Sequence, residues 1–288
     1  MMYRDTLSHE NYTLELACYK ALIALSAFSL LVSLGLSLKF KSFLPNVHLT
    51  VAAFNFLAYY VLTEVIYTII FDEGVYLLIY YISVLLDYMA RLFVWLAAVE
   101  VFRLNPRKPL IWILVYLMYL LALGLIGVEG VCVVVLGIVQ MVLGETTSPV
   151  ILETMAKSKL VALYFPWAFV GSVFLFFVFY YKTVNHFYGT FILYYMILVP
   201  GLLVLTINEN VLSKTDQNDV RSAFIAEFVV YRLAYLLAIV WGSLFASQWA
   251  KSKEVRQPGD VTADAVDIDI DDFDEKAEAS HSSRVHMV

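Results

Sequence analysis

Cysteine and histidine are scarce in this chain, and their scarcity excludes several kinds of metal site. The 288 residues include two cysteines, Cys18 and Cys132, and five histidines. Neither cysteine belongs to a CxxC or Cys/His pattern, so no structural zinc site is predicted. Only His48 and His186 flank apolar segments, which argues against a histidine-ligated metal centre in the membrane. The sequence therefore predicts no metal and no cofactor, and a disulfide between the two cysteines is disfavoured.

Charged residues are also few. They make up 15% of the chain and hydrophobic residues 61%, whereas soluble domains average about 25% charged and about 45–50% apolar residues. Such an excess of apolar side chains needs a lipid bilayer, not a soluble core, to cover it. No basic cluster suited to nucleic acid is present, and the HExxH, GxSxG and P-loop motifs are absent. We therefore expect a membrane protein with no nucleic-acid partner.

Seven segments are long and apolar enough to cross a bilayer, which takes about 20 mostly apolar residues. They are residues 16–38, 48–71, 76–102, 109–128, 160–181, 189–207 and 223–249. The connection 129–159 contains another apolar run, Val131–Leu143, which is short for a span and is interpreted as interfacial or re-entrant. An eighth span is the alternative. The predicted fold class is all-α, a polytopic transmembrane helix bundle with seven spans.

The placement of lysine and arginine predicts the orientation of this bundle. With the N-terminus outside, most basic residues near the spans fall on the inner side, as the positive-inside rule requires. The same count does not distinguish seven spans from eight. The sequon Asn11-Tyr12-Thr13 fits an external N-terminus and predicts glycosylation at Asn11. The membrane is that of the endoplasmic reticulum or the plasma membrane, and the sequence does not choose between them.

The end of the chain differs in composition from the rest. Residues 264–278 are strongly acidic, with isoleucine and valine interleaved, and cannot bury a core. The sequence thus predicts an external segment over 1–15, the bundle over 16–250 and a disordered cytosolic tail over 251–288. The favoured role of the tail is in solubility, trafficking or phosphorylation. Docking of a cytosolic partner is the alternative.

Ionisable residues inside spans are costly and mark candidate functional sites. The second and third spans contain Glu64, Asp87 and Arg91. Asp87 and Arg91 are four residues apart, so they share a helix face and are predicted to pair. Glu227 and Arg232 lie in the last span five residues apart, which separates them by about 140° around an α-helix and disfavours a pair.

Arg232 therefore needs a partner on another helix, and Glu64 and Asp87 are the candidates. These residues predict a polar pocket between spans two, three and seven, lined by the catalytic candidates Glu64, Asp87 and Glu227. The alternative is an ion-pair network that fixes the helices. Glu100, at the inner end of span three, is expected to snorkel toward the membrane surface.

Tyrosine is abundant, and several of the 20 tyrosines surround this charged set. Aromatic faces stabilise a bound or developing cation, although aromatic packing is the alternative explanation. The candidate substrate-binding residues are Tyr60, Tyr67, Tyr88, Arg91, Tyr231 and Arg232.

Two short stretches are similar to a known family. Thr63-Glu64-Val65-Ile66-Tyr67 resembles the Trp-Glu-x-Ile-Tyr segment of the fungal seven-helix membrane terpene cyclases of meroterpenoid and indole-diterpene pathways, with Thr63 in place of tryptophan. Leu85-Leu86-Asp87 is similar to a Leu-Asp pair in the same proteins. The resemblance implies that Glu64 protonates an epoxide or olefin and starts polyene cyclisation. Glu227 would loosely take the place of a late-helix acid.

Three functions remain open. The first is an enzyme acting on a lipophilic small molecule, a cyclase or isomerase, because a carboxyl group in a low-dielectric pocket can carry a proton at neutral pH. The second is a seven-span receptor or sensor, although the Asp-Arg-Tyr and Asn-Pro-x-x-Tyr motifs are absent and the last span has no lysine for retinal. The third is a transporter or accessory protein, for which Pro166 and Pro200 are candidate helix breaks.

Overall fold

The computed structural model describes residues 9–40, 44–69, 73–103, 109–143, 148–180, 196–207 and 227–255, and within these ranges it contains helices and no strand. The elements are α1 (His9–Lys39), α2 (Leu44–Thr68), α3 (Glu73–Arg103), α4 (Pro109–Leu143), α5 (Pro149–Tyr180), the short helix Met196–Ile207, the π-helical turn η4 (Glu227–Arg232) and α8 (Leu233–Val255). The predicted all-α class is confirmed for this part of the chain.

Five of the described helices are long and apolar enough to cross a membrane. Their apolar stretches are Leu16–Lys39, Pro45–Thr68, Gly74–Ala97, Tyr116–Val139 and Val230–Ser247. A 24-residue stretch measures about 36 Å at a rise of about 1.5 Å per residue, which exceeds a hydrocarbon core of about 30 Å. The helices indicate an integral membrane protein. Seven spans, an external N-terminus and the boundaries at residues 15 and 250 stay predictions.

Helix α4 corrects the interpretation of residues 129–159. The run Val131–Leu143, expected to be interfacial or an eighth span, continues the helix that begins at Pro109 without a break. The run looked short only because the fourth span was ended before Glu129, and that residue is fully buried within the helix instead of ending it. Helix α5 then begins at Pro149, a residue whose fixed φ suits a first helical turn.

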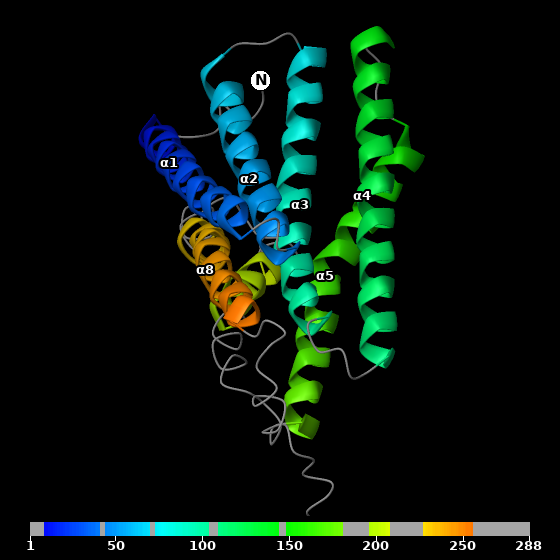
Figure 1. The fold of residues 1–288 in the computed structure, drawn as a ribbon. Coiled ribbons are helices and arrows are strands. Elements are labelled where there is room, and N and C mark those ends of the chain that lie inside the picture. The colour runs from blue at the N-terminus through cyan, green and yellow to red at the C-terminus, as the bar shows by residue number, and fades with distance from the viewer. Residues whose placement is uncertain are drawn as a thin grey trace, which may run out of the picture. The chain divides into compact units, whose positions relative to one another are not determined.

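The first five helices pack in chain order. Helix α2 contacts α1 and α3, and α4 contacts α3 and α5 (Figure 1). Two contacts set α3 antiparallel to α4: Tyr119 is hydrogen-bonded to Glu100, and Gly137 lies so close to Leu78 that an added Cβ would overlap it. This register places Glu129 at the level of residues 86–88 of α3.

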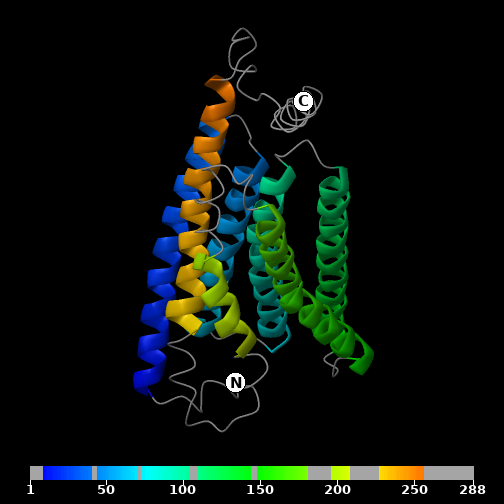
Figure 2. The same ribbon diagram turned by 90° about the horizontal axis from the view of Figure 1, so that it is seen from below.

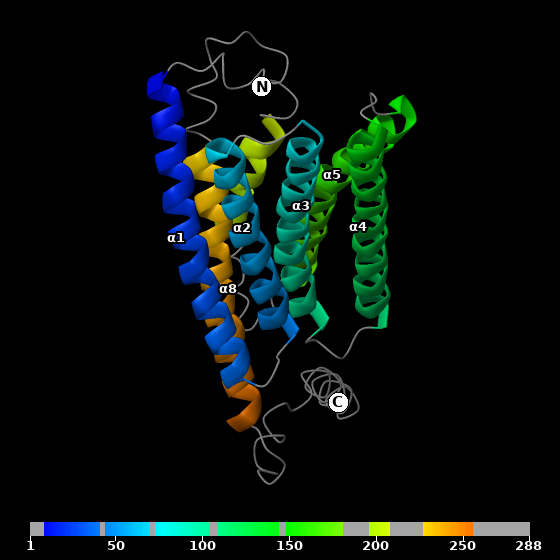
Figure 3. The same cartoon turned by 90° about the horizontal axis from the view of Figure 1, so that it is seen from above.

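Residues 233–248 of α8 lie beside α1 and α2 in all three views of the bundle (Figures 1, 2 and 3). They belong to the same compact unit as the other helices, Met1–Gln248. The largest fully buried side chains are mainly aromatic and gather where α2, α3, η4 and α8 meet. They include Phe56, Tyr60, Tyr88, Trp95, Tyr231 and Tyr235.

Candidate functional site

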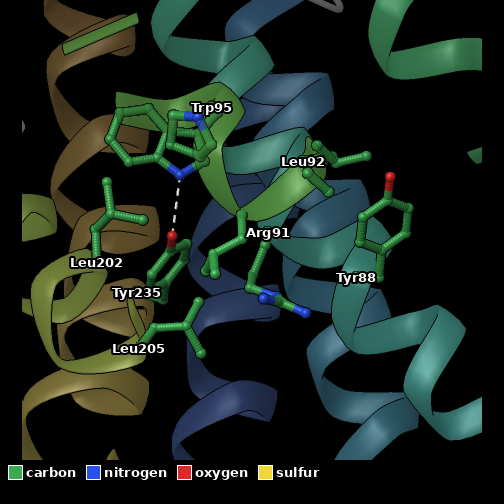
Figure 4. Close-up of a pocket in the computed structure, with 10 residues that line it drawn as sticks. Tyr88, Arg91, Leu92, Trp95, Leu202, Leu205 and Tyr235 are labelled. Atoms are coloured by element: carbon green, nitrogen blue, oxygen red, sulfur yellow. Dashed lines mark hydrogen bonds between the residues drawn. The ribbon is translucent and has the colours of Figure 1, made fainter. Parts of the chain in front are cut away.

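A pocket lies among α3, α5, the helix Met196–Ile207 and α8 (Figure 4). It is lined by Tyr88, Arg91, Leu92, Trp95, Ala162, Leu163, Pro166, Leu202, Leu205 and Tyr235. The cavity volume is about 10 Å³, roughly the space that one water molecule needs. A larger ligand therefore enters only if the side chains that line the pocket move apart.

The pocket contains one member of an intramembrane ion pair. Arg91 Nη2 lies 3.1 Å from Asp87 Oδ2, which confirms the predicted pairing. Arg91 Nε also donates to the backbone carbonyl of Asp87 over 3.4 Å. The second carboxylate oxygen, Asp87 Oδ1, is buried and has no hydrogen-bond partner in the described part of the chain. Arg91 thus presents its positive charge to the pocket, and the ion pair with Asp87 fixes the position of its guanidinium.

Arg232 is surrounded by tyrosines. Its Nη2 donates to the Tyr59 hydroxyl over 3.1 Å, and its guanidinium carbon lies 5.2 to 5.7 Å from the ring centroids of Tyr19, Tyr59 and Tyr60. Among the described residues it forms no ion pair with Glu64 of α2 or Asp87 of α3, the two carboxylates that the sequence predicted as its partners. Aromatic faces from α1 and α2 contribute to the stabilisation of this buried cation.

The turn η4 changes the relation between Glu227 and Arg232. The separation of about 140° holds for an α-helix, but this segment is π-helical. In a π-helix the N–H of residue i+5 bonds the carbonyl of residue i, so the two residues lie nearly one above the other. The sequence-based argument against their pairing therefore does not apply to this backbone. The Glu227 side chain lies outside the described residues.

Trp95 connects the pocket to an aromatic chain. Its Nε1 donates to the Tyr235 hydroxyl over 2.9 Å (Figure 4). The Tyr235 ring lies 5.1 Å from that of Tyr231 and 6.0 Å from that of Phe56, between centroids. Phe56 in turn stacks on Tyr60 at 5.9 Å. These contacts hold α2, η4 and α8 around the ion pair on α3.

Three buried tyrosine hydroxyls have no hydrogen-bond partner among the described residues: those of Tyr60, Tyr88 and Tyr231. All three tyrosines are at most 2% exposed. Proteins normally satisfy buried hydroxyls, through a side chain, ordered water or a ligand. The hydroxyls therefore mark positions where a ligand or water can bind, and Tyr88 is the one that lines the pocket.

Pro166 interrupts the hydrogen bonding of α5 at the pocket wall. Proline has no N–H, so the carbonyl four residues earlier, at Ala162, loses its helical donor. Both residues line the pocket. The break thus leaves a backbone acceptor beside the ligand space.

The other predicted site residues lie elsewhere. Glu64 is half-buried on α2 and is not part of the pocket lining. Tyr67 packs on Tyr19 of α1, with 5.6 Å between ring centroids. Asn11 lies in the first turns of α1, and its side chain is outside the described residues. Of the predicted residues, the pocket brings together Tyr88 and Arg91.

Glu129 is a buried carboxylate that the sequence-based reasoning missed. Its side chain is fully buried in α4, where Ser158 Oγ donates to Oε2 over 2.5 Å and Lys159 Nζ lies 3.8 Å from Oε1. The signal was present in the sequence, since an acidic residue inside a long apolar helix is itself unusual. It was overlooked because the predicted span ended at residue 128.

Glu100 is a second correction. The side chain was expected to snorkel, but it is 3% exposed and accepts a hydrogen bond from the Tyr119 hydroxyl over 2.5 Å. The same hydroxyl is also hydrogen-bonded to His48. A nearby hydroxyl satisfies the carboxylate inside the bundle, so the side chain has no need to reach the surface. The three residues join α2, α3 and α4.

Protein-family models, curated proteins and solved structures were compared with this chain, and none matches it. Within the described residues, no group of three or more histidine, cysteine, aspartate or glutamate side chains is placed to hold a metal ion. Function is therefore inferred from the pocket, the ion pair beside it and the Tyr88 hydroxyl, which has no hydrogen-bond partner among the described residues.

Proposed function

We propose that this protein is a membrane-embedded enzyme that carries out acid–base chemistry on a lipophilic small molecule bound in the pocket. The observation that carries the proposal is the ion pair between Asp87 and Arg91, because Arg91 lines the pocket and Asp87 lies one turn before it on α3. The guanidinium thereby presents its positive charge to the pocket.

Polar groups in the pocket and beside it each have a role in this chemistry. Asp87, which lies beside the lining, exchanges a proton with the substrate through Oδ1, which is buried and has no hydrogen-bond partner among the described residues. The Arg91 guanidinium binds an oxygen of the substrate and stabilises negative charge that develops there. The rings of Tyr88 and Tyr235 offer their faces to a developing carbocation. A substrate with one oxygen function and an apolar remainder fits this arrangement.

The motif at residues 63–67 supports a related reaction, because it resembles the terpene cyclases that protonate a polyene. That resemblance assigns the acid to Glu64. Neither carboxylate lines the pocket, and we favour Asp87 because its ion-pair partner Arg91 does. Cyclisation or isomerisation of a polyene is therefore the reaction we propose first, with Glu64 as the alternative acid.

Lipid extracts of cells that produce the full chain test this proposal. Wild type is compared with Asp87→Asn and with Ala162→Phe, which fills the pocket. The matched control is Val161→Phe, because Val161 is 46% exposed on the same helix and does not line the pocket. We expect a product in wild type and Val161→Phe that is lost in the other two. Identical extracts from correctly folded variants would reject the enzyme.

Transport is the second candidate, and two breaks in helical geometry favour it. Pro166 interrupts α5 at the pocket, and η4 precedes the helix that contributes Tyr235. Discontinuous helices beside a binding site near mid-membrane are typical of transporters. A transporter moves its substrate unchanged, so the same extracts, taken separately from cells and medium, would then show redistribution without any new species.

A further inference from the structure

Glu129 is a fully buried carboxylate of α4 that lies at the level of residues 86–88 of α3. Its contact with Lys159 is long: 3.8 Å separates Nζ from Oε1, against about 2.7–2.9 Å for a charge-assisted hydrogen bond. Oε1 has no hydrogen-bond partner among the described residues. One oxygen of this carboxylate therefore has an unfilled hydrogen-bonding position among the described residues.

Helix α5 connects Glu129 to the pocket. Two residues of α5, Ser158 and Lys159, contact Glu129. One helical turn later on the same face, Ala162 follows Ser158 and Leu163 follows Lys159, and both of these later residues line the pocket. The carboxylate and the pocket thus lie along one face of α5, about one turn apart.

Tyr88 provides the connection on α3. It lines the pocket, and both Glu129 and Arg91 are near enough to act on its hydroxyl electrostatically. That hydroxyl is buried and has no hydrogen-bond partner among the described residues. This hydroxyl is not hydrogen-bonded to Glu129, so a proton passes between the two through an intervening water.

Lys159 provides the connection to the surface. Its side chain is 41% exposed, whereas that of Glu129 is fully buried. The titratable groups that act on Glu129 from the described helices are Lys159 of α5, Tyr88 of α3 and, within α4, Cys132. The titratable neighbours of Glu129 on other helices are thus one cation near the surface, Lys159, and one hydroxyl at the pocket, that of Tyr88.

We propose that Glu129 is a second proton-exchanging carboxyl group, which passes protons between Lys159 and the Tyr88 hydroxyl. This inference rests on the proposed function, because it supplies the return path for the proton that Asp87 exchanges. The Lys159 ammonium protonates the Glu129 carboxylate and takes a new proton from water. Through the intervening water, Glu129 then protonates the Tyr88 oxygen as that hydroxyl gives its own proton to an acceptor in the pocket. The carboxylate is regenerated, and nothing is oxidised or reduced.

A hydrophobic carbodiimide tests the inference without a known substrate. Dicyclohexylcarbodiimide reacts with protonated carboxyl groups in apolar surroundings: the carboxyl proton moves to a carbodiimide nitrogen, the oxygen bonds to the central carbon, and acyl transfer leaves a stable N-acylurea. Membranes that contain the full chain are treated, and the modified residues are located by peptide mass spectrometry. We expect labelling at Glu129, retention in Glu129→Asp and loss in Glu129→Gln.

Glu153 is the matched control residue. It forms an exposed ion pair with Lys157 on α5, with side chains 65% and 70% exposed. A water-soluble carbodiimide should modify Glu153 and leave Glu129 unmodified. Absence of labelling at Glu129 by the hydrophobic reagent would mean a permanently ionised partner of Lys159 and would overturn the inference.

A second comparison tests the link to the pocket. Ala162→Phe, which fills the pocket one turn from Ser158, should slow the labelling of Glu129, and Val161→Phe, at an exposed position of the same helix, should not. Equal labelling in both variants would separate Glu129 from the pocket and overturn the proposed relay. The two proposals can fail independently of each other. Carbodiimide labelling of Glu129 does not require Asp87, and the loss of product in Asp87→Asn does not require that Glu129 can be labelled.

Discussion

Trp95 and Tyr235 join α3 to α8 at the pocket wall through a hydrogen bond of 2.9 Å from the indole Nε1 to the phenol oxygen. Both side chains are at most 1% exposed. Because the Tyr235 ring also packs against Tyr231 and Phe56, this bond sets the position of the aromatic chain beside the ion pair. The packing of the core and the geometry of the pocket are thus coupled at one contact.

Loss of this bond should reduce stability measurably. We expect Tyr235→Phe to lower the free energy of unfolding by about 1 kcal/mol, because the buried indole N–H loses its acceptor. Thermal unfolding in detergent measures the change. In a double-mutant cycle with Trp95→Phe, the second substitution should cost less than the first. Fully additive effects would mean that the bond contributes nothing.

Removing one member of the ion pair between Asp87 and Arg91 should destabilise the protein more than removing both members. We expect Asp87→Asn or Arg91→Met alone to destabilise by about 2 kcal/mol, less than the roughly 3–5 kcal/mol of a fully buried pair, since both side chains are partly exposed. The double variant should recover part of this loss because no charge is left unpaired. The exposed pair of Glu153 and Lys157 serves as control, and its removal should cost about 0–1 kcal/mol. Equal losses in both pairs would contradict the buried role of the first.

The aromatic surroundings of Arg232 make a different prediction. Tyr60→Phe keeps the ring that lies 5.5 Å from the guanidinium and should change stability little, because the Tyr60 hydroxyl has no partner among the described residues. Tyr60→Leu removes the ring and should cost about 1–2 kcal/mol more, through lost cation–π and stacking contacts. Thermal unfolding separates the two variants. A similar loss in both would show that the ring face does not stabilise Arg232.

Alanine substitutions at two glycines should change the stability of the protein in opposite directions. At Gly124 an added Cβ meets nothing within 4 Å, so Gly124→Ala should stabilise α4 by about 0.5–1 kcal/mol through reduced backbone freedom. At Gly201 the Cβ would lie 3.1 Å from Ala234 Cβ and 3.3 Å from the backbone oxygen of Val230. Gly201→Ala should therefore destabilise the contact between its helix and η4. Stabilisation at both positions would contradict this close approach.

Local spacing was enough to predict some of these features. The four-residue separation of Asp87 and Arg91 implies one helix face, and the structure contains the pair. The long apolar runs likewise predicted helices able to cross a membrane. Both features depend on residues close in sequence, which is why one sequence can indicate them.

Other features depend on contacts between distant segments. The tyrosines around Arg232 come from α1 and α2, and no spacing rule brings them to it. The π-helical geometry of η4 has no local signal in the sequence, so the angles of an α-helix do not apply to Glu227 and Arg232. Glu129 was lost for a simpler reason: an acidic residue was treated as the end of a span, although Ser158 and Lys159 stabilise it within one.

The central claim is that Asp87 exchanges a proton with a lipophilic molecule held in the pocket. The most direct measurement is to incubate membranes containing the full chain with a lipid extract in D2O and to follow lipophilic products by mass spectrometry. Wild type and Val161→Phe should form a product that carries deuterium from the solvent, and Asp87→Asn and Ala162→Phe should not. A product without solvent deuterium, or the same deuterated product from correctly folded Asp87→Asn, would contradict the account.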